Sequence, residues 1–141
     1  MLADYYMEQK NYKKAITLLK NILTQEKDND RALRQLWEIY IAKWDYGTAE
    51  LMIEKAIRLK NNNPRYLYSM VDIKYNSANI DDAIYLMEKI LKLRPISSEY
   101  LIATAMLHEE KGEIQKAKKY YFEVLEHEPD NRTAKIKLKN I

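Results

Sequence analysis

The residues best suited to chemistry in this chain are two histidines and pairs of adjacent carboxylates. His108 and His127 lie nineteen residues apart, and the stretch HEEKGE that begins at His108 has no second histidine one helical turn away. A zinc-binding His-Glu-x-x-His helix needs that second imidazole to complete its ligand set. We therefore expect His108 to pack inside the protein, and we expect no metal site.

Asp81 and Asp82 are one such pair of adjacent carboxylates. They lie at the start of a predicted helix, where the free backbone amides favour negative charge. We expect both side chains to point outward, which argues against a general acid–base pair. The chain also has no cysteine, no glycine-rich phosphate loop and no nucleophile–histidine arrangement. We predict that it is not an enzyme and that it binds no cofactor.

The composition indicates a helical protein with a well-solvated surface. Of the 141 residues, 47% are hydrophobic and 32% are charged, while only two are glycine and three are proline. Strand-and-turn proteins use more of these two residue types. No apolar run approaches the roughly 20 residues that span a bilayer, and the start MLADYYMEQK lacks the pattern of a signal peptide. We predict a cytoplasmic protein without a membrane span.

The net charge of +3 comes from the last ten residues. Four basic residues lie there with no acid among them: Arg132, Lys135, Lys137 and Lys139. Residues 1–131 hold 20 basic against 21 acidic groups, a net charge of −1. A segment with this net charge is poorly suited to bind a phosphate backbone, so we do not expect a nucleic-acid partner.

The elements that would position any site follow an internal repeat of 34 residues. Alanine recurs at that interval, as Ala15, Ala49, Ala83 and Ala117. Large side chains stand four and eight residues after each alanine, and a second stretch with the same helical spacing precedes it in each later unit. Each unit therefore predicts two helices. We interpret the alanine as the small residue that lets the two helices approach closely.

Capping residues mark where these helices begin. Asn11, Asp45 and Asn79 are suited to cap the second helices of the first three units. Glu113 takes this position in the fourth unit, where it is a weaker cap that still suits a helix amino end. The breaks between units are NNNP at 61–64, RPISS at 94–98 and EPDN at 128–131.

At these positions the chain resembles the tetratricopeptide repeat family. The family pattern is Trp-x2-Leu-Gly-x2-Tyr, then Ala-x3-Phe, then Pro, within 34 residues. Residues 30–63 supply Leu33, Leu36, Trp37, Tyr40, Ala49, Ile53 and Asn61 at those spacings, and residues 98–131 supply Leu101, Thr104, Ala105, His108, Ala117, Tyr121 and Pro129. The chain departs from the pattern at Trp37, which fills the small-residue position, at Lys74, which stands where Tyr is expected, and at Trp44, which replaces the glycine of the inner turn. These departures predict local repacking within the same fold.

The resemblance implies an all-α fold, a right-handed α-α superhelix of about four helix pairs plus a carboxyl-terminal capping helix. We predict a single domain over residues 1–141, with repeats at 1–29 (truncated), 30–63, 64–97 and 98–131 and the capping helix at 132–141. The first unit starts five residues late in the pattern. Either Met1 is a true start that frays, or the chain is a fragment of a longer array.

The first helix of each unit carries a second stripe besides the one that packs. The stripes comprise Asp4, Met7 and Glu8; Arg31, Arg34, Gln35, Glu38, Ile41 and Ala42; Arg65, Tyr68, Ser69, Asp72, Tyr75 and Asn76; and Glu99, Ile102, Ala103, Met106, Glu109 and Glu110. The resemblance implies that these stripes line a concave wall that binds a peptide or helix of a partner protein. The expected binding residues are those of the last three stripes, apart from Ala42, Asn76, Ala103 and Glu110.

This predicted wall has a mixed chemistry. Tyr68, Tyr75, Ile41, Ile102 and Met106 make an apolar middle, three arginines make a basic region, and Glu99, Glu109 and Glu110 make an acidic region. Our hypothesis is a peptide ligand with an apolar anchor and charges of both signs. One subfamily grips a free carboxylate with Lys, Arg and Asn, but Glu99 would repel that group, so we reject such a clamp.

The function that follows is a protein–protein interaction module, a scaffold or adaptor without catalysis. Two alternatives stay open at this point. One is an RNA-binding helical-repeat protein, which the charge of residues 1–131 disfavours. The other is a self-associating assembly subunit, in which another copy covers the apolar end left by the truncated first unit.

Overall fold

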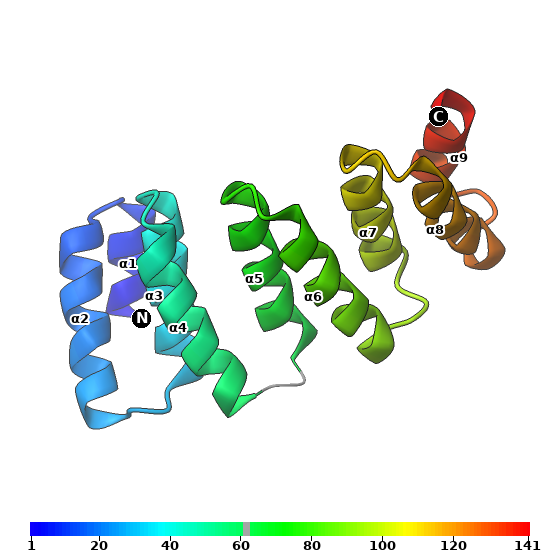
Figure 1. Cartoon of the computed structure of the whole chain (residues 1–141). Helices are drawn as coiled ribbons and strands as arrows, with labels where there is room; N and C mark the ends of the chain where they lie inside the picture. Colours follow the sequence, from blue (N-terminus) through cyan, green and yellow to red (C-terminus); the bar gives the residue numbers. More distant parts are fainter. Residues whose placement is uncertain (61–62) are drawn as a thin grey trace. The chain divides into compact units, whose positions relative to one another are not determined.

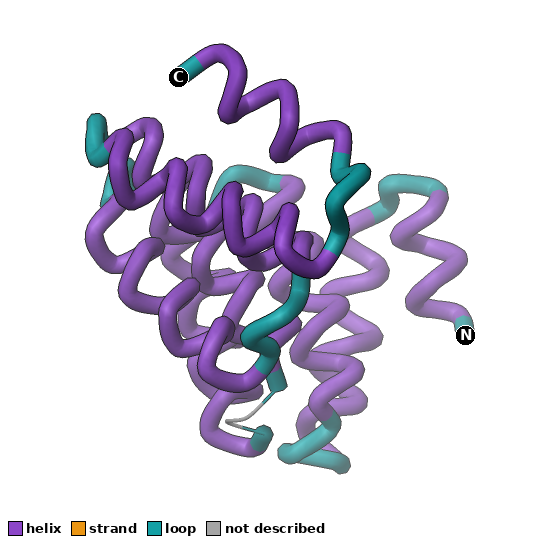
Figure 2. The backbone as a smooth tube through the Cα atoms, turned by 90° about the vertical axis from the view of Figure 1, so that its right-hand side faces the viewer, coloured by secondary structure: helices purple, strands orange, loops and turns teal. Residues whose placement is uncertain are grey.

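The computed structural model describes residues 1–60 and 63–141, and within these ranges the chain forms nine α-helices and no strand (Figures 1 and 2). The helices fall into two compact units, Met1–Tyr66 and Leu67–Ile141. The repeat position Asn61, and with it part of the predicted NNNP break, lies outside the described residues. The assignment of residues 1–141 to a single domain stays a prediction.

Four helices and the start of a fifth make up the first unit. They are α1 (Leu2–Glu8), α2 (Tyr12–Gln25), α3 (Asp30–Ala42) and α4 (Tyr46–Leu59), followed by the first residues of α5 (Pro64–Asn76). Here α1 packs on α2, α2 on α3, and α3 on α4. The result is two antiparallel helix pairs, with the short α1 as the first member (Figure 1).

The second unit continues from α5. Its other helices are α6 (Ile80–Leu93), α7 (Ser98–Glu110), α8 (Ile114–His127) and α9 (Arg132–Asn140). Within it α6 packs on α7, α7 on α8, and α8 on α9.

The repeated alanines lie at the centre of the helix packing. Ala15, Ala49, Ala83 and Ala117 are all 0% exposed, and so are the residues one turn later, Leu19, Ile53, Met87 and Tyr121. A methyl group at the first position lets the backbones approach, and the larger side chain at the second fills the space beyond it. The packing role predicted for the alanines is confirmed.

The predicted caps begin the second helices of the first three pairs. Asn11, Asp45 and Asn79 each accept a hydrogen bond from a backbone N–H three residues on, at 3.4, 3.2 and 3.2 Å. Glu113 forms no such bond at the start of α8, as its weaker capping ability predicts. First helices are capped too, by Asn29 on α3, Ser97 on α7 and Asn131 on α9. Caps of this kind satisfy amides that the helix itself leaves free.

The turn inside each pair has the same backbone conformation. Lys10, Trp44, Ala78 and Gly112 recur at intervals of 34 residues and all have positive φ, from 55° to 85°. In each turn the next residue donates its N–H to a carbonyl five residues back, at 2.8 Å in all four cases. This is the Schellman arrangement, in which a left-handed residue ends a helix. Only Gly112 adopts this conformation without steric cost from a Cβ.

The departure at Trp37 is accommodated by aromatic packing. Trp37 is 2% exposed, and its ring meets the Tyr66 ring edge-on with centroids 5.4 Å apart. The Tyr66 hydroxyl donates to Asp30, whose carboxylate also pairs with Lys60 at 2.9 Å. Burial and then the bond to Asp30 raise the pKa of Tyr66 to about 12. The large Trp37 side chain at the small-residue position is thus buried within the first unit by packing against Tyr66.

The last helix covers the end of the second unit's core. Ala134 of α9 is 0% exposed and joins a cluster with Leu101, Ala105, Ala117, Tyr121 and Val124. Leu138 and Ile141 pack against the same cluster, while Arg132, Lys135 and Lys139 are exposed. This is the one-sided distribution that the sequence predicts for a capping helix.

Candidate functional site

A pocket of about 250 Å³ opens between α5 and α7 within the second unit. Both helices contribute residues at the spacing of one helical face. The lining comprises Tyr68, Val71, Asp72 and Tyr75 from α5 and Ala103, Met106, Leu107 and Glu110 from α7. Four of the predicted wall residues therefore come together here, namely Tyr68, Asp72, Tyr75 and Met106.

The tyrosines of the pocket are held by their neighbours. The Tyr68 ring lies 5.6 Å from the Tyr100 ring, centroid to centroid. Tyr75 hydrogen-bonds to the Glu110 carboxylate, and this bond is the main reason that the pKa of Tyr75 is raised. Burial, followed by the charge of Asp72, raises the pKa of Tyr68. Both phenols therefore stay neutral and present aromatic faces together with hydroxyl groups.

Asp72 stands out among the charged groups of this pocket. Its side chain keeps contact with solvent, but the apolar surroundings desolvate the carboxylate and raise its pKa. Desolvation by burial is the cause of this rise. The site thus contains a carboxylate that would gain from a positive partner.

Two other predicted wall residues of α7 serve internal packing. Glu109 accepts a hydrogen bond from the Tyr121 hydroxyl at 2.9 Å and pairs with Lys137 of α9 at 3.2 Å. Ile102 packs against the core cluster beneath α9. Glu99 at the first turn of α7 is exposed, as is Met106, which is 48% exposed. The structure therefore places Met106, rather than Glu109 or Ile102, at the pocket.

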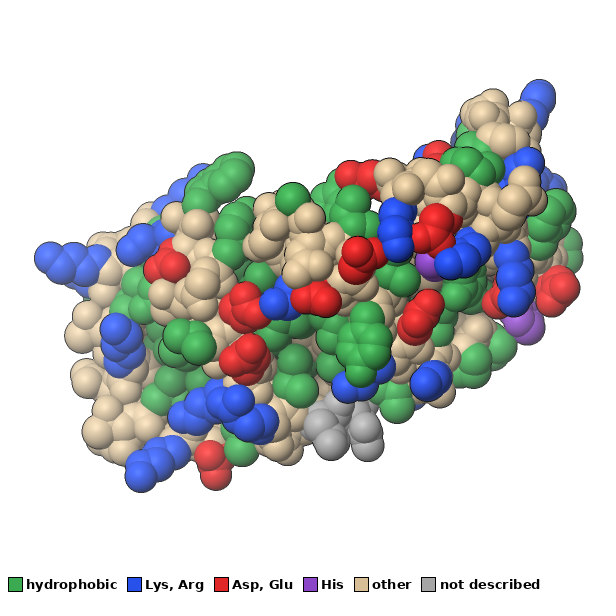
Figure 3. Space-filling model, viewed as in Figure 1, with side chains coloured by type: hydrophobic (Ala, Val, Ile, Leu, Met, Phe, Trp, Pro, Cys, Tyr) green, Lys and Arg blue, Asp and Glu red, His purple; other side chains and the backbone are tan. Residues whose placement is uncertain are grey.

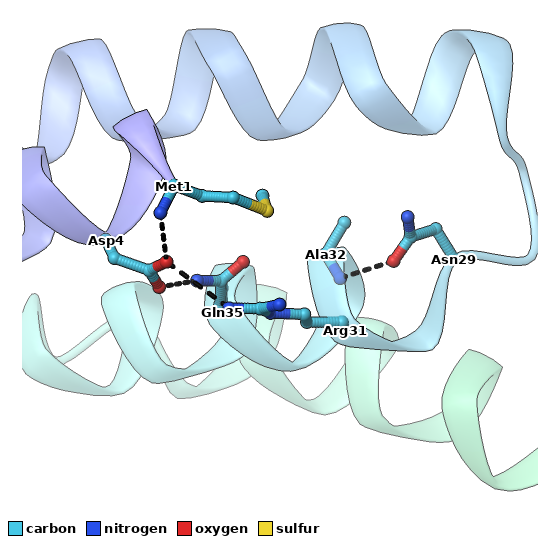
Figure 4. Close-up of polar contacts among 6 residues, drawn as sticks. All are labelled: Met1, Asp4, Asn29, Arg31, Ala32 and Gln35. Carbon is cyan, nitrogen blue, oxygen red and sulfur yellow. Dashed lines mark hydrogen bonds and ion pairs between the residues drawn. The ribbon is translucent and has the colours of Figure 1, made fainter.

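The predicted wall residues of the first unit form a polar network around Asp4 (Figure 4). Gln35 donates a short hydrogen bond to one carboxylate oxygen of Asp4, and Arg31 pairs with the other at 3.3 Å. The Met1 amino group lies 3.2 Å from the same carboxylate. Gln35 is only 3% exposed, so its side chain fastens α3 to α1 and presents little surface to a partner.

The remaining predicted wall residues are more open. Arg34 and Glu38 face each other one turn apart on α3, with 3.9 Å between their charged atoms, and each side chain is nearly half exposed. Ile41 is half-buried at the end of α3, Arg65 is exposed and Ser69 is half-buried on α5. On the face shown in Figure 3, side chains of both charge signs are interspersed with hydrophobic ones.

His108 is a packing residue, as the sequence predicts. It is 3% exposed and stacks on Tyr120 with ring centroids 5.5 Å apart, and its Nδ1 lies 3.3 Å from Glu113 Oε2. Hydrogen bonds from Lys111 and then Lys116 lower the pKa of Glu113 to about 2. Lys111 also pairs with Asp81 at 2.7 Å, and the Asp81 side chain points outward.

The described ranges contain no candidate metal site and no candidate membrane span. No group of three or more His, Cys, Asp or Glu side chains in residues 1–60 and 63–141 is placed to hold a metal ion. None of the helices in these same residues has the length and apolar character that crossing a membrane requires.

Comparison with known proteins decides the family of the first half of the chain. Residues 6–73 match the tetratricopeptide repeat family. This segment is a tetratricopeptide repeat segment. No curated protein sequence matches the chain significantly.

Solved structures extend the tetratricopeptide repeat fold over almost the whole chain. The crystal structure of MamA superposes with a TM-score of 0.79 at 17% identity, covering 95% of this chain and 78% of that one. MamA from Desulfovibrio magneticus RS-1 gives 0.77 at 16% identity, covering 92% and 73%. YrrB, described as a tetratricopeptide repeat protein with an unusual peptide-binding site, gives 0.74 at 19% identity, covering 94% and 68%. At these identities the likeness concerns the fold.

Together these findings confirm the resemblance drawn from the sequence and the predicted fold class, an all-α solenoid of the tetratricopeptide repeat type. The partner-binding role of the predicted wall residues stays a prediction. Sequence reasoning did not assign Val71 and Leu107 to the site, although both line the pocket. Their hydrophobic side chains carry no signal that separates a pocket floor from a core position.

Proposed function

We propose that the chain is a non-catalytic protein-interaction module, a scaffold or adaptor whose first helices bind a peptide or helix of a partner protein. The observation that carries this proposal is the pocket between α5 and α7, where Tyr68, Tyr75 and Met106 meet. Membership of residues 6–73 in the tetratricopeptide repeat family supports it. So does the likeness to YrrB, a protein described as having a peptide-binding site.

The size of the pocket favours a side chain over a free small molecule. Pockets for small ligands usually measure about 300–1,000 Å³ and enclose most of the ligand. This one is smaller, at about 250 Å³, and it lies open between two helices. It suits one or two anchor side chains of a longer ligand, which the exposed helix faces on either side would contact further.

The pocket walls are ordered before any ligand arrives. Val71 and Leu107 are buried beneath the pocket, at 5% and 7% exposure, and they fix α5 and α7 in the core of the unit. A ligand therefore loses its own conformational freedom on binding, while the protein loses little. Tyrosine and methionine at the surface adapt to ligands of different shape.

A peptide-selection experiment tests this function. Random peptides displayed on phage are selected against the full chain, and the affinities of the selected peptides are measured by fluorescence anisotropy. We expect Tyr68→Ala with Tyr75→Ala to weaken binding at least tenfold, since interface aromatics often contribute 2 kcal/mol or more.

The matched control is Tyr85→Ala, because Tyr85 is 62% exposed on α6 and does not line the pocket. Circular dichroism of each variant confirms that the helices remain. If every selected peptide binds the double variant as tightly as the unchanged chain, the proposed site is wrong.

A further inference from the structure

The pocket between α5 and α7 also has a defined charge, and the inference drawn from it rests on the function proposed above. Two carboxylates line it, Asp72 from α5 and Glu110 from α7. Among the described residues of its lining there is no lysine and no arginine. Glu99 adds negative potential nearby, since its charge acts on the Tyr68 hydroxyl.

Two lysines close to α7, Lys111 and Lys137, are engaged with carboxylates outside the pocket lining. Lys111 pairs with Asp81 at 2.7 Å and with Glu113 at 2.8 Å. Lys137 pairs with Glu109, on the side of α7 that faces α9. Glu110 accepts a hydrogen bond from the Tyr75 hydroxyl. Because this hydroxyl is neutral, the bond does not compensate the negative charge of Glu110.

The other lining groups fit the stem of a basic side chain. Val71, Ala103, Met106 and Leu107 supply aliphatic surface, and the tyrosine rings supply aromatic faces. Lysine and arginine have an apolar stem that packs on such surfaces and a charged head that can reach a carboxylate. Aromatic faces attract the same heads through cation–π interaction. An anionic or purely apolar side chain would leave both carboxylates desolvated without compensation.

We propose that this pocket takes a lysine or arginine side chain of the partner peptide, with its stem between the tyrosines and its cationic head between Asp72 and Glu110. The partner class is thus a peptide or helix with a basic anchor residue next to apolar neighbours. The pocket acts as the specificity determinant within the wider binding surface.

The test starts from peptides that are selected from the random phage library against the full chain. Only those peptides are used that bind the Tyr68→Ala and Tyr75→Ala double variant more weakly than the unchanged chain. In each peptide the basic residues are replaced one at a time, lysine by norleucine and arginine by citrulline. We expect one replacement per peptide to weaken binding to the unchanged chain by about tenfold, the usual effect of losing a bond to a charged group.

The peptide replacements are combined with a protein variant, Asp72→Asn with Glu110→Gln, in a double-mutant cycle. This variant should bind the basic peptide about tenfold more weakly and should bind the neutralised peptide as the unchanged chain does, because each change removes the same interaction. The matched control, Glu88→Gln with Glu126→Gln, removes two exposed charges from α6 and α8 outside the pocket and should leave affinity unchanged.

The outcomes separate this inference from the function on which it rests. Tyrosine-dependent peptides that carry no required basic residue, or that bind the Asp72→Asn and Glu110→Gln variant unchanged, overturn the basic-anchor proposal and leave the interaction module standing. Failure to obtain any tyrosine-dependent peptide overturns the proposed function itself. Equal losses in the pocket variant and the control variant show a general charge effect and also overturn the proposal.

Discussion

Alanine substitutions at the two glycines of the chain should change its stability in opposite directions. Gly112 ends the turn between α7 and α8 with a φ of 85°, whereas Gly47 is the second residue of α4. An added Cβ at either position meets no heavy atom within 4 Å. Because neither substitution creates a clash, backbone conformation alone decides the sign of the effect.

The magnitudes follow from two opposing contributions. Gly112→Ala puts a Cβ in the left-handed region at a cost of about 1–2 kcal/mol, and the lower entropy of the unfolded chain returns about 0.4–1 kcal/mol. The net loss is about 0.5–1 kcal/mol. Gly47→Ala meets no such strain, so the free energy of unfolding rises by about 0.5–1 kcal/mol. Ala78→Gly, at the equivalent turn before α6, should stabilise by about as much as Gly112→Ala destabilises.

Urea unfolding followed by far-ultraviolet circular dichroism measures these changes. With a typical slope of about 2 kcal/mol per molar urea, each substitution moves the midpoint by about 0.4 M. Gly47→Ala is the control for helix propensity, and Ala78→Gly is the control for turn strain. A lower midpoint for Gly47→Ala, or an unchanged or higher one for Gly112→Ala, would refute the reasoning.

The remaining predictions concern the core and the charges. Ala83→Leu should destabilise the chain by about 1–3 kcal/mol through overpacking, while Ala42→Leu on an exposed position should be near neutral in the same urea assay. Tyr121→Phe removes the hydroxyl bond to Glu109 and should cost about 1 kcal/mol, and a midpoint equal to that of the unchanged chain would contradict this. Because the pKa of Glu113 is lowered from 4.5 to about 2, its stabilising effect is present above pH 4.5 and is lost as pH falls through about 2. Glu113→Gln should therefore flatten the acid side of a stability-versus-pH curve, and a parallel curve would argue against that role.

The repeat could be predicted in detail because its signals are local. Helix periodicity, the small residue at the crossing and the caps each depend on residues within a few positions of one another. Ala49 and its 0% exposure, or Asn79 and its bond to the Asp82 amide, follow from such short-range patterns. For the same reason the bounds of helices such as α6 and α8 were accessible from sequence.

The side-chain partners in the predicted wall could not be assigned because they come from distant residues. Gln35 bonds to Asp4, thirty-one positions earlier, and Glu109 pairs with Lys137, twenty-eight positions later. A periodic stripe shows which face of a helix a residue occupies, but it does not show whether a later or earlier helix engages that face. Both residues were expected to face a partner, and in the structure both also join helices of the same chain.

The pocket illustrates a second limit of sequence reasoning. Tyr68 and Tyr75 belong to the predicted stripe, but the depth of the site depends on Val71 and Leu107. These hydrophobic residues look like ordinary core positions in the pattern. Only the relative placement of α5 and α7 turns them into the floor of a pocket.

The most direct test of the interaction surface is a methionine methyl NMR titration with a tyrosine-dependent selected peptide. The chain has six methionines, and labelling their methyl carbons reports on several helices at once. Met106 lines the pocket, whereas Met87 is fully buried in α6 and Met52 lies on α4. We predict that the Met106 signal, assigned through Met106→Leu, shifts with peptide concentration while those of Met87 and Met52 stay in place. A saturable shift at Met87 or Met52 with Met106 unmoved would contradict the account.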